Sequence, residues 1–338
     1  MTIATPAVLL VGSGFHRDVL GEAPSPFCCW RTLLDMVAQD IGARGSTQRS
    51  LSPPLTWEML VLAATQLSLV CASDGLAASQ AEQKLRNRVA RILGIHAAEP
   101  LQRWEQSKAF AAIKAFVVAG PCHLLDLNFD DVLPRLFKCE HARLPDGLFE
   151  GTQGRPEVRR ADVTPLFGRW RSAEYAGLTL WKPHGHVGEP RTLRLGLRDY
   201  GLEPTLIRGA VDDYKAVEDD VFNPDGSRHQ VERYLDGPCP PASRIADTWV
   251  TRVMELPCTM IGLSVSEVEW GLQWLVVQRA RNYARRGTRP HLRSFRTSPS
   301  NALPGMDEIE FETWSAAWTA LSGARNSVET SNWYEPSR

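Results

Sequence analysis

Four short apolar runs, each followed closely by glycine or a polar residue, constrain the fold of this 338-residue chain most strongly. An unbroken apolar run of this length is typical of a strand that is buried on both faces. Helical periodicity separates the runs, so they predict a parallel α/β sheet of the Rossmann-like class. The carboxyl edge of such a sheet gathers the residues that follow its strands. The runs are 7–11, 122–127, 178–182 and 258–263, and the residues expected at that edge are Gly12, Asn128, His184 and Ser264.

Between the first two runs, the pattern predicts an all-helical insertion. Thr56 is placed to cap the first of its helices. Turn-forming residues are frequent in 139–165 and 203–245, which are expected to be irregular. The helices are expected over 56–71, 77–93 and 101–118. The predicted organisation is a core of 1–55 and 120–300, an insertion of 56–119, and a C-terminal helix and tail of 301–338.

The amino-acid composition limits the classes of binding partner that we expect for this protein. The chain is 43% hydrophobic and 23% charged with a formal net charge of −1, which indicates a folded protein without an overall basic field for nucleic acid. The run 7–11 is too short to span a bilayer, and no basic residue precedes it. The seven cysteines are scattered and form no C-x-x-C pair, which favours a reducing cytoplasm. We expect a cytoplasmic protein with no membrane and no direct nucleic-acid partner.

The turn after the first run contains Gly12 and Gly14 and fits a phosphate-binding loop, because glycine lets the backbone approach an anion. Arg17 stands where the dehydrogenase fingerprint has its third glycine. No second strand ends in an acid at the expected spacing. A nicotinamide dehydrogenase is therefore disfavoured, and a tight structural turn remains the alternative.

Polar residues after the other runs are candidates for chemistry. Asn128 can bind a hydroxyl or orient water, and His184 can accept a proton near neutral pH. Each has a structural alternative: Asp130 could cap the next helix, and His184 could be a buried structural histidine. His184 and His186 could also form half of a metal site, but no other histidine clearly completes it, so no metal is expected. Ser264 precedes Ser266-x-x-Glu269, which fits a helix capping box.

Taken in chain order, these features resemble the sirtuin-like domain, particularly its bacterial NAD-consuming branch. The resemblance covers about residues 6–295, although His16 stands where the family usually has Ser or Thr. The zinc ribbon of the deacylating members is absent from the sequence. The motifs are Gly12-Ser13-Gly14-Phe15, Pro26 through Leu34 with Trp30, Leu127-Asn128-Phe129-Asp130, Lys182-Pro183-His184-Gly185, Asp199-Tyr200 and Gly262-Leu263-Ser264-Val265-Ser266-Glu267.

The resemblance implies a glycohydrolase that cleaves NAD+ to nicotinamide and ADP-ribose through an oxocarbenium-like transition state. Asn128 would hold the ribose and the attacking water, and His184 would accept a proton. Asp130 would orient Asn128 or bind ribose. The remaining NAD-binding residues would be Gly12, Ser13, Gly14 and Phe15 at the diphosphate, together with Gly262, Ser264 and Glu267, the last two toward the adenosine.

The resemblance also implies a biological role. The bacterial branch includes toxic effectors of antiphage defence, so we expect activity that is held back until a trigger arrives. Control would come from homo- or hetero-oligomerisation or from a separate sensor or regulatory protein. The alternatives are an NAD-dependent protein deacylase, a sensor that binds NAD or ADP-ribose without turnover, and a metal-dependent hydrolase.

Overall fold

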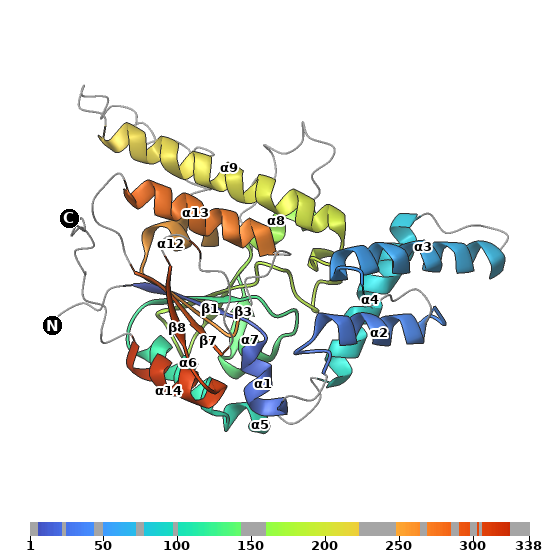
Figure 1. Ribbon diagram of the computed structural model, residues 1–338, viewed down its shortest axis with the longest axis horizontal. Helices are drawn as coiled ribbons and strands as arrows, with labels where there is room; N and C mark the ends of the chain where they lie inside the picture. Colours follow the sequence, from blue (N-terminus) through green and yellow to red (C-terminus); the bar gives the residue numbers. More distant parts are fainter. Residues whose placement is uncertain are drawn as a thin grey trace.

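The computed structural model confirms an α/β fold with a mostly parallel sheet (Figure 1). It describes residues 6–21, 25–43, 50–71, 78–96, 101–142, 160–222, 248–263, 269–284, 291–297, 303 and 306–324. Within these residues, no helix is both long enough and apolar enough to cross a bilayer.

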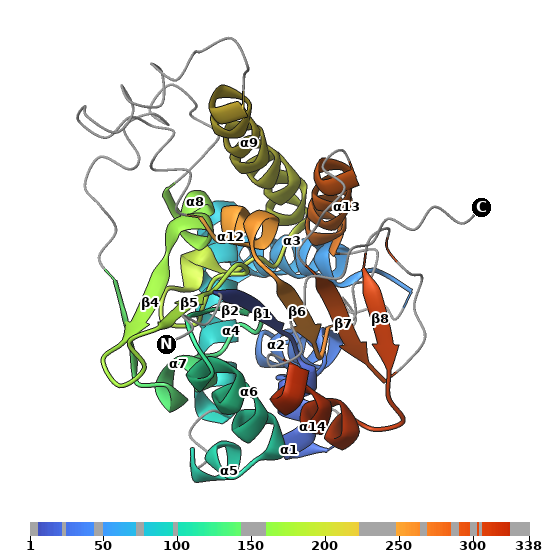
Figure 2. The same cartoon turned by 90° about the vertical axis from the view of Figure 1, so that its left-hand side faces the viewer.

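The eight-stranded sheet has the order β3-β4-β5-β2-β1-β6-β7-β8, which is visible in Figure 2. The six strands from β5 to β8 are parallel, and β3 and β4 add an antiparallel pair at one edge. Counted in chain order, the parallel strands run 3-2-1-4-5-6, the order of dinucleotide-binding Rossmann sheets. That order reverses between β1 and β6. The strands are β1 (Ala7–Val11), β2 (Cys122–Asp126), β3 (Cys139–His141), β4 (Arg169–Ser172), β5 (Leu178–Trp181), β6 (Cys258–Ile261), β7 (Leu292–Arg296) and β8 (Asp307–Glu310).

Strand β1 lies at the centre of the sheet and is buried on both faces. It pairs in parallel with β2 on one side and with β6 on the other. Leu9 and Val11 pack into the core on one face, whereas Val8 and Leu10 pack into the core on the opposite face. The continuous apolar run therefore predicts this strand correctly, because both of its faces need apolar side chains.

Helices cover both faces of the sheet (Figure 1). On the first face lie α1 (Gly14–Leu20), α5 (Gln102–Glu105), α6 (Lys108–Val118), α7 (Val132–Leu136) and α14 (Trp314–Ala324). On the second lie α8 (Arg160–Phe167), α9 (Leu197–Phe222), α12 (Trp249–Glu255) and α13 (Trp270–Ala284). A short 3-10 helix, η3 (Pro190–Thr192), follows β5.

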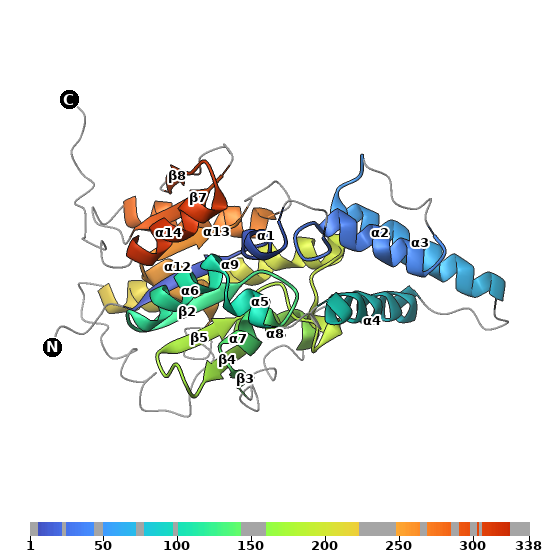
Figure 3. The ribbon, with the colours of Figure 1, turned by 90° about the horizontal axis from the view of Figure 1, so that it is seen from below.

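Three further helices, α2 (Trp30–Asp40), α3 (Pro53–Cys71) and α4 (Ala78–His96), form a lobe beside the sheet (Figures 1 and 3). The lobe has its own apolar core, to which Leu193 and Leu195 of the segment after β5 also contribute. The expected helical block over 56–119 is thus divided. Helices α3 and α4 join α2 in the lobe, whereas α6 packs on the sheet face, against α14 and β-sheet side chains.

Local differences from the expectations have physical causes. Helix α3 begins at Pro53 rather than after Thr56, because proline favours the first helical position. The Thr56 hydroxyl donates to the Ser52 carbonyl at 3.0 Å instead of capping the helix.

The irregular structure expected from residue 203 is wrong for the first part of that stretch, which belongs to α9. Pro204 lies inside this helix, and the side chains of Tyr200, Ile207 and Val211 are buried. Burial of one helix face compensates for the hydrogen bond that proline removes. Likewise, β3 and α8 begin and end the stretch 139–165 that was expected to be loop.

Candidate functional site

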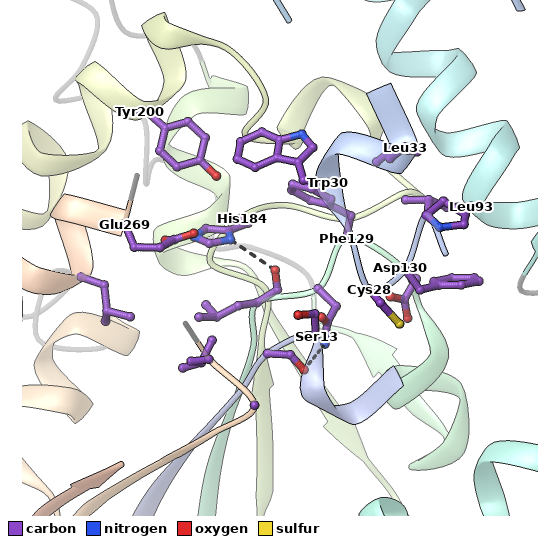
Figure 4. A pocket seen from close by; sticks show the side chains of 18 residues that line it. Ser13, Cys28, Trp30, Leu33, Leu93, Phe129, Asp130, His184, Tyr200 and Glu269 are labelled. Atoms are coloured by element: carbon purple, nitrogen blue, oxygen red, sulfur yellow. Dashed lines mark hydrogen bonds and ion pairs between the residues drawn. The ribbon is translucent and has the colours of Figure 1, made fainter. Parts of the chain in front are cut away.

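A cavity of about 180 Å³ lies at the point where the strand order reverses (Figure 4). The sequence predicted that Gly12, Asn128 and His184 would meet at the carboxyl edge of the sheet, and all three line this cavity. Ser264 and Glu267 lie outside the described residues. Helices α2 and α4 of the lobe and helix α9 also contribute side chains to the cavity lining. Its lining is Gly12, Ser13, Pro26, Phe27, Cys28, Trp30, Leu33, Leu93, Leu127, Asn128, Phe129, Asp130, His184, Tyr200, Gly262, Leu263, Glu269 and Leu272.

The turn Gly12-Ser13-Gly14 after β1 packs closely against the loop after β6. The Gly12 N–H donates to the Ile261 carbonyl and the Gly14 N–H to the Gly262 carbonyl, each at 3.0 Å. A Cβ atom on Gly14 would lie 2.5 Å from the Cα of Gly262, whose φ of +70° also favours glycine. These two N–H groups are therefore already used and do not point to a bound phosphate.

The four residues of the turn differ in their access to the cavity. Gly12 and Ser13 line it, as does Gly262, whereas Gly14 and Phe15 do not. Phe15 is fully buried in the apolar core. Of the four residues expected to contact the diphosphate, Ser13 is the one that still fits that role. It lines the cavity, and its hydroxyl makes no hydrogen bond within the described chain.

Asn128 is oriented by its neighbours. Its Nδ2 donates to Asp126 Oδ1 at 2.8 Å and to the Gly12 carbonyl at 3.3 Å. The Asn128 backbone N–H donates to the same Asp126 oxygen at 3.1 Å. Both amide protons are used, so the side-chain carbonyl oxygen is the group left to accept a hydrogen bond from a ligand.

Lys182 holds the loop that carries Asn128. Its Nζ donates to Asp126 Oδ2 at 2.8 Å, to the Asp130 carbonyl at 2.6 Å and to the Asn128 carbonyl. Lys182 is 2% exposed and Asp126 is fully buried. All three ammonium protons therefore have acceptors, as a buried charge requires. The sequence offered one signal that was overlooked: a lysine and an aspartate each end an apolar strand.

The Asp130 carboxylate is used within the protein. One oxygen accepts from His16 Nε2 at 2.8 Å, and the other accepts from the Val132 N–H of α7 at 2.9 Å. Trp104 Nε1 lies 3.2 Å from His16 Nδ1, and because indole can only donate, the His16 proton is on Nε2. Burial raises the pKa of Asp130, but His16 and Lys182 outweigh it and hold that pKa well below its usual range. The Asp130 carboxylate thus accepts from the first N–H of α7, as the capping interpretation expected, and not from the Asn128 side chain. His16 has Asp130 as its partner.

His184 has hydrogen-bond acceptors at both ring nitrogens. Nδ1 lies 3.2 Å from the Leu127 carbonyl oxygen, and Nε2 lies 3.3 Å from Glu269 Oε2 and 3.9 Å from Glu203 Oε1. Burial lowers the pKa of His184, but the two carboxylates outweigh burial and raise it to about 9. These surroundings favour the protonated form of His184, whereas the base expected from the sequence is a neutral imidazole.

Aromatic rings form one wall of the cavity. The centroid of Trp30 lies 5.4 Å from that of Tyr200 and 6.1 Å from that of Phe129. His184 lies 6.2 Å from Tyr200 and 6.3 Å from Phe129, so the four rings surround one space (Figure 4). Such a wall suits a planar ring.

The two histidines of His184-x-His186 have different surroundings. His186 packs against His141 and Trp170, with ring centroids at 6.0 and 5.0 Å, away from the carboxylates at His184. Burial, with Lys182 and His141 nearby, lowers the pKa of His186 to about 3. In the part of the chain that the structure describes, no group of three His, Cys, Asp or Glu side chains could hold a metal ion.

Sequence reasoning missed two acids of the site. Glu269 was assigned to the capping box, and Glu203 lies in the stretch expected to be irregular. A helical reading of 200–211 would have placed Tyr200 and Glu203 on one face. Comparison with protein-family models, curated proteins and solved structures found no match to this chain.

Proposed function

We propose that the protein is an NAD+ glycohydrolase that resembles the NAD-consuming branch of the sirtuin-like family. One observation carries the proposal: Asn128 and His184 line a single cavity at the reversal point of a 3-2-1-4-5-6 sheet. Dinucleotides bind at that point in sheets of this order. The reaction itself comes from the sequence resemblance.

The residues suit this chemistry. Nicotinamide leaves the ribose as a neutral molecule, so no general acid is required, and the transition state is oxocarbenium-like. The free carbonyl oxygen of Asn128 accepts a hydrogen bond from a ribose hydroxyl or from the attacking water. The wall of Trp30, Phe129 and Tyr200 receives the cationic nicotinamide ring. Ser13 contributes a donor to the diphosphate.

The proposed setting is antiphage defence in the cytoplasm. Unrestrained loss of NAD+ would kill the host, so the activity is held back by oligomerisation or by a separate sensor protein until a trigger arrives. No disulfide bond involves Cys28, Cys29, Cys122, Cys139 or Cys258 in the part of the chain that the structure describes, which fits a reducing compartment.

A second candidate is a sensor that binds NAD+ or ADP-ribose without turnover. One observation favours it: both nitrogens of His184 already have partners, so the ring does not present a free base. A protein deacylase would instead release nicotinamide faster when an acylated peptide is added.

Chromatography of NAD+ after incubation with the purified protein tests the proposal, with total NAD+ in expressing cells measured in parallel in case a partner is required. The wild type should give nicotinamide and ADP-ribose, and Asn128→Ala should lose at least ~100-fold of that rate. Asn87→Ala, on the exposed side of α4, is the matched control and should keep full activity. Bound but uncleaved NAD+ in both assays would favour the sensor, and no binding at all would reject the proposal.

A further inference from the structure

Hydrolysis of NAD+ has one requirement for proton transfer. Water and NAD+ give ADP-ribose, neutral nicotinamide and one proton, so the site needs one base and no acid. That base must reach the cavity and must be unprotonated at neutral pH. The following inference rests on the proposed glycohydrolase activity.

The geometry of His184 leaves it unable to serve as that base. Nδ1–H donates to the Leu127 carbonyl at 3.2 Å and Nε2 lies 3.3 Å from Glu269 Oε2, so both ring nitrogens have partners. The ring is 8% exposed, and its backbone partner cannot move without displacing the loop after β2. Leu127 is the residue before Asn128, so this contact also helps to position Asn128.

Glu269 reaches the cavity, and its carboxyl group is of a type that can accept a proton. It lines the cavity, and its side chain is 20% exposed, whereas that of Glu203 is 8% exposed and does not line the cavity. Figure 4 shows Glu269 and His184 side by side, with Tyr200 above them. Among the described residues, the Glu269 carboxylate contacts His184 through Oε2 alone, which leaves Oε1 to accept a hydrogen bond from a ligand.

We propose that Glu269 is the catalytic base of this site and that His184 is a positioning residue that stays protonated. As the bond from the ribose C1′ to nicotinamide breaks, its electron pair leaves with nicotinamide. Water forms the new bond to C1′ and gives one proton to Glu269. The carboxylic acid then releases that proton to solvent.

The charges around His184 fit this assignment. Glu203 and Tyr200 face it from α9, Glu269 from the residue before α13, and Arg194 from the segment after β5. Burial raises the pKa of Glu203, with His184 and Arg194 opposing it. Glu203 is the more buried of the two glutamates and does not line the cavity, whereas Glu269 does.

The test compares Glu269→Gln with Glu203→Gln as a matched control, since both replacements keep shape and remove one carboxylate near His184. NAD+ binding is measured by calorimetry and hydrolysis by nicotinamide release. Glu269→Gln should bind NAD+ within a few-fold of the wild type and lose ~10²–10⁴-fold of kcat. Glu203→Gln should lower kcat by at least tenfold less than Glu269→Gln does, because Glu203 does not line the cavity. Glu269→Ala should regain activity with added formate or azide, whereas Asn128→Ala should not.

The pH profile gives a second readout. If His184 were the base, kcat/KM of the wild type should rise with pH through about 9, where His184 loses its proton; with Glu269 as base it should not rise there. An active wild type with an equally active Glu269→Gln, or with a rise in kcat/KM through that range, would overturn the inference and leave the glycohydrolase intact. A wild type that binds NAD+ without turnover would overturn both.

Discussion

The charge on His184 should be visible in the stability of the protein. Its pKa is raised to about 9 in the folded state by Glu269 and Glu203 against the effect of burial, compared with about 6.5 in an unfolded chain. A raised pKa stabilises the fold at pH values below the unfolded value. That contribution is lost as pH rises through the folded value.

We therefore predict that the wild type loses on the order of 3 kcal/mol of unfolding free energy between pH ~6.5 and ~9 that His184→Gln does not lose. Urea titrations of both proteins across this range measure the difference. Parallel pH profiles for the two proteins would show that the imidazolium is not formed.

The buried contact of Lys182 with Asp126 makes a second prediction. Lys182→Met leaves the Asp126 carboxylate buried without its cation, which should cost about 3–5 kcal/mol. The double variant Lys182→Met with Asp126→Asn should recover part of that loss, because no charge remains unpaired. Additive losses in urea denaturation would contradict a direct interaction.

Elements of the lobe hold the start of α9. Arg86 of α4 donates to Asp199 Oδ2 at 2.7 Å and also to the Leu193 carbonyl. Glu58 of α3 accepts from the Leu197 N–H at 2.9 Å. Because α9 carries Tyr200 and Glu203 toward His184, these contacts connect the lobe to the site.

We predict that Arg86→Met destabilises the protein by about 3 kcal/mol and weakens NAD+ binding, since a buried carboxylate loses its partner. The control is Arg88→Met on the same helix, where the pair with Asp40 is 37% and 33% exposed. That change should cost less than ~1 kcal/mol and leave binding unaltered. Thermal unfolding and calorimetry decide between them, and equal effects would exclude a specific role for Arg86.

The strength of the local pattern decided which elements could be predicted. Strand β1 is a continuous apolar run, and β2, β5 and β6 are mostly apolar, because burial on two faces requires apolar side chains. The short strands β3 and β4, which form the antiparallel pair at one end of the sheet, carry charged residues, so no apolar pattern marks them. Helix α9 was missed because an internal proline and many acids mask the buried side.

At the scale of the whole molecule, the cavity joins the sheet to the lobe. Asn128 and His184 follow strands, whereas Trp30 and Leu33 belong to α2 and Leu93 to α4. A ligand in this cavity contacts both parts and should stabilise them together.

We predict that ADP-ribose, at a concentration one hundred times its Kd, raises the unfolding free energy by roughly 2.7 kcal/mol. Hydrogen exchange should slow in α2, in α4 and in the loop after β2 at the same ligand concentration. Trp30→Ala should lose the protection in the lobe. Protection limited to the sheet in the wild type would mean that the lobe does not take part in binding.

The site was only partly predictable for a related reason. Residues that follow strands are close in space because of the sheet topology, so Gly12, Asn128 and His184 could be placed together from the sequence. Glu203 and Glu269 come to His184 from helices on the second face, and no spacing in the sequence encodes that approach. The residues that contact His184 depend on tertiary packing, which local sequence patterns do not describe.

The position of β1 has a consequence for how the protein is made. Strand β1 is synthesised well before β6 (Cys258–Ile261), which is one of its two neighbours in the sheet. A nascent chain that stops earlier has a central strand with one open side and lacks Gly262, Leu263 and Glu269 at the cavity. Under the proposed function, a chain interrupted before β6 would lack part of the NAD+ site.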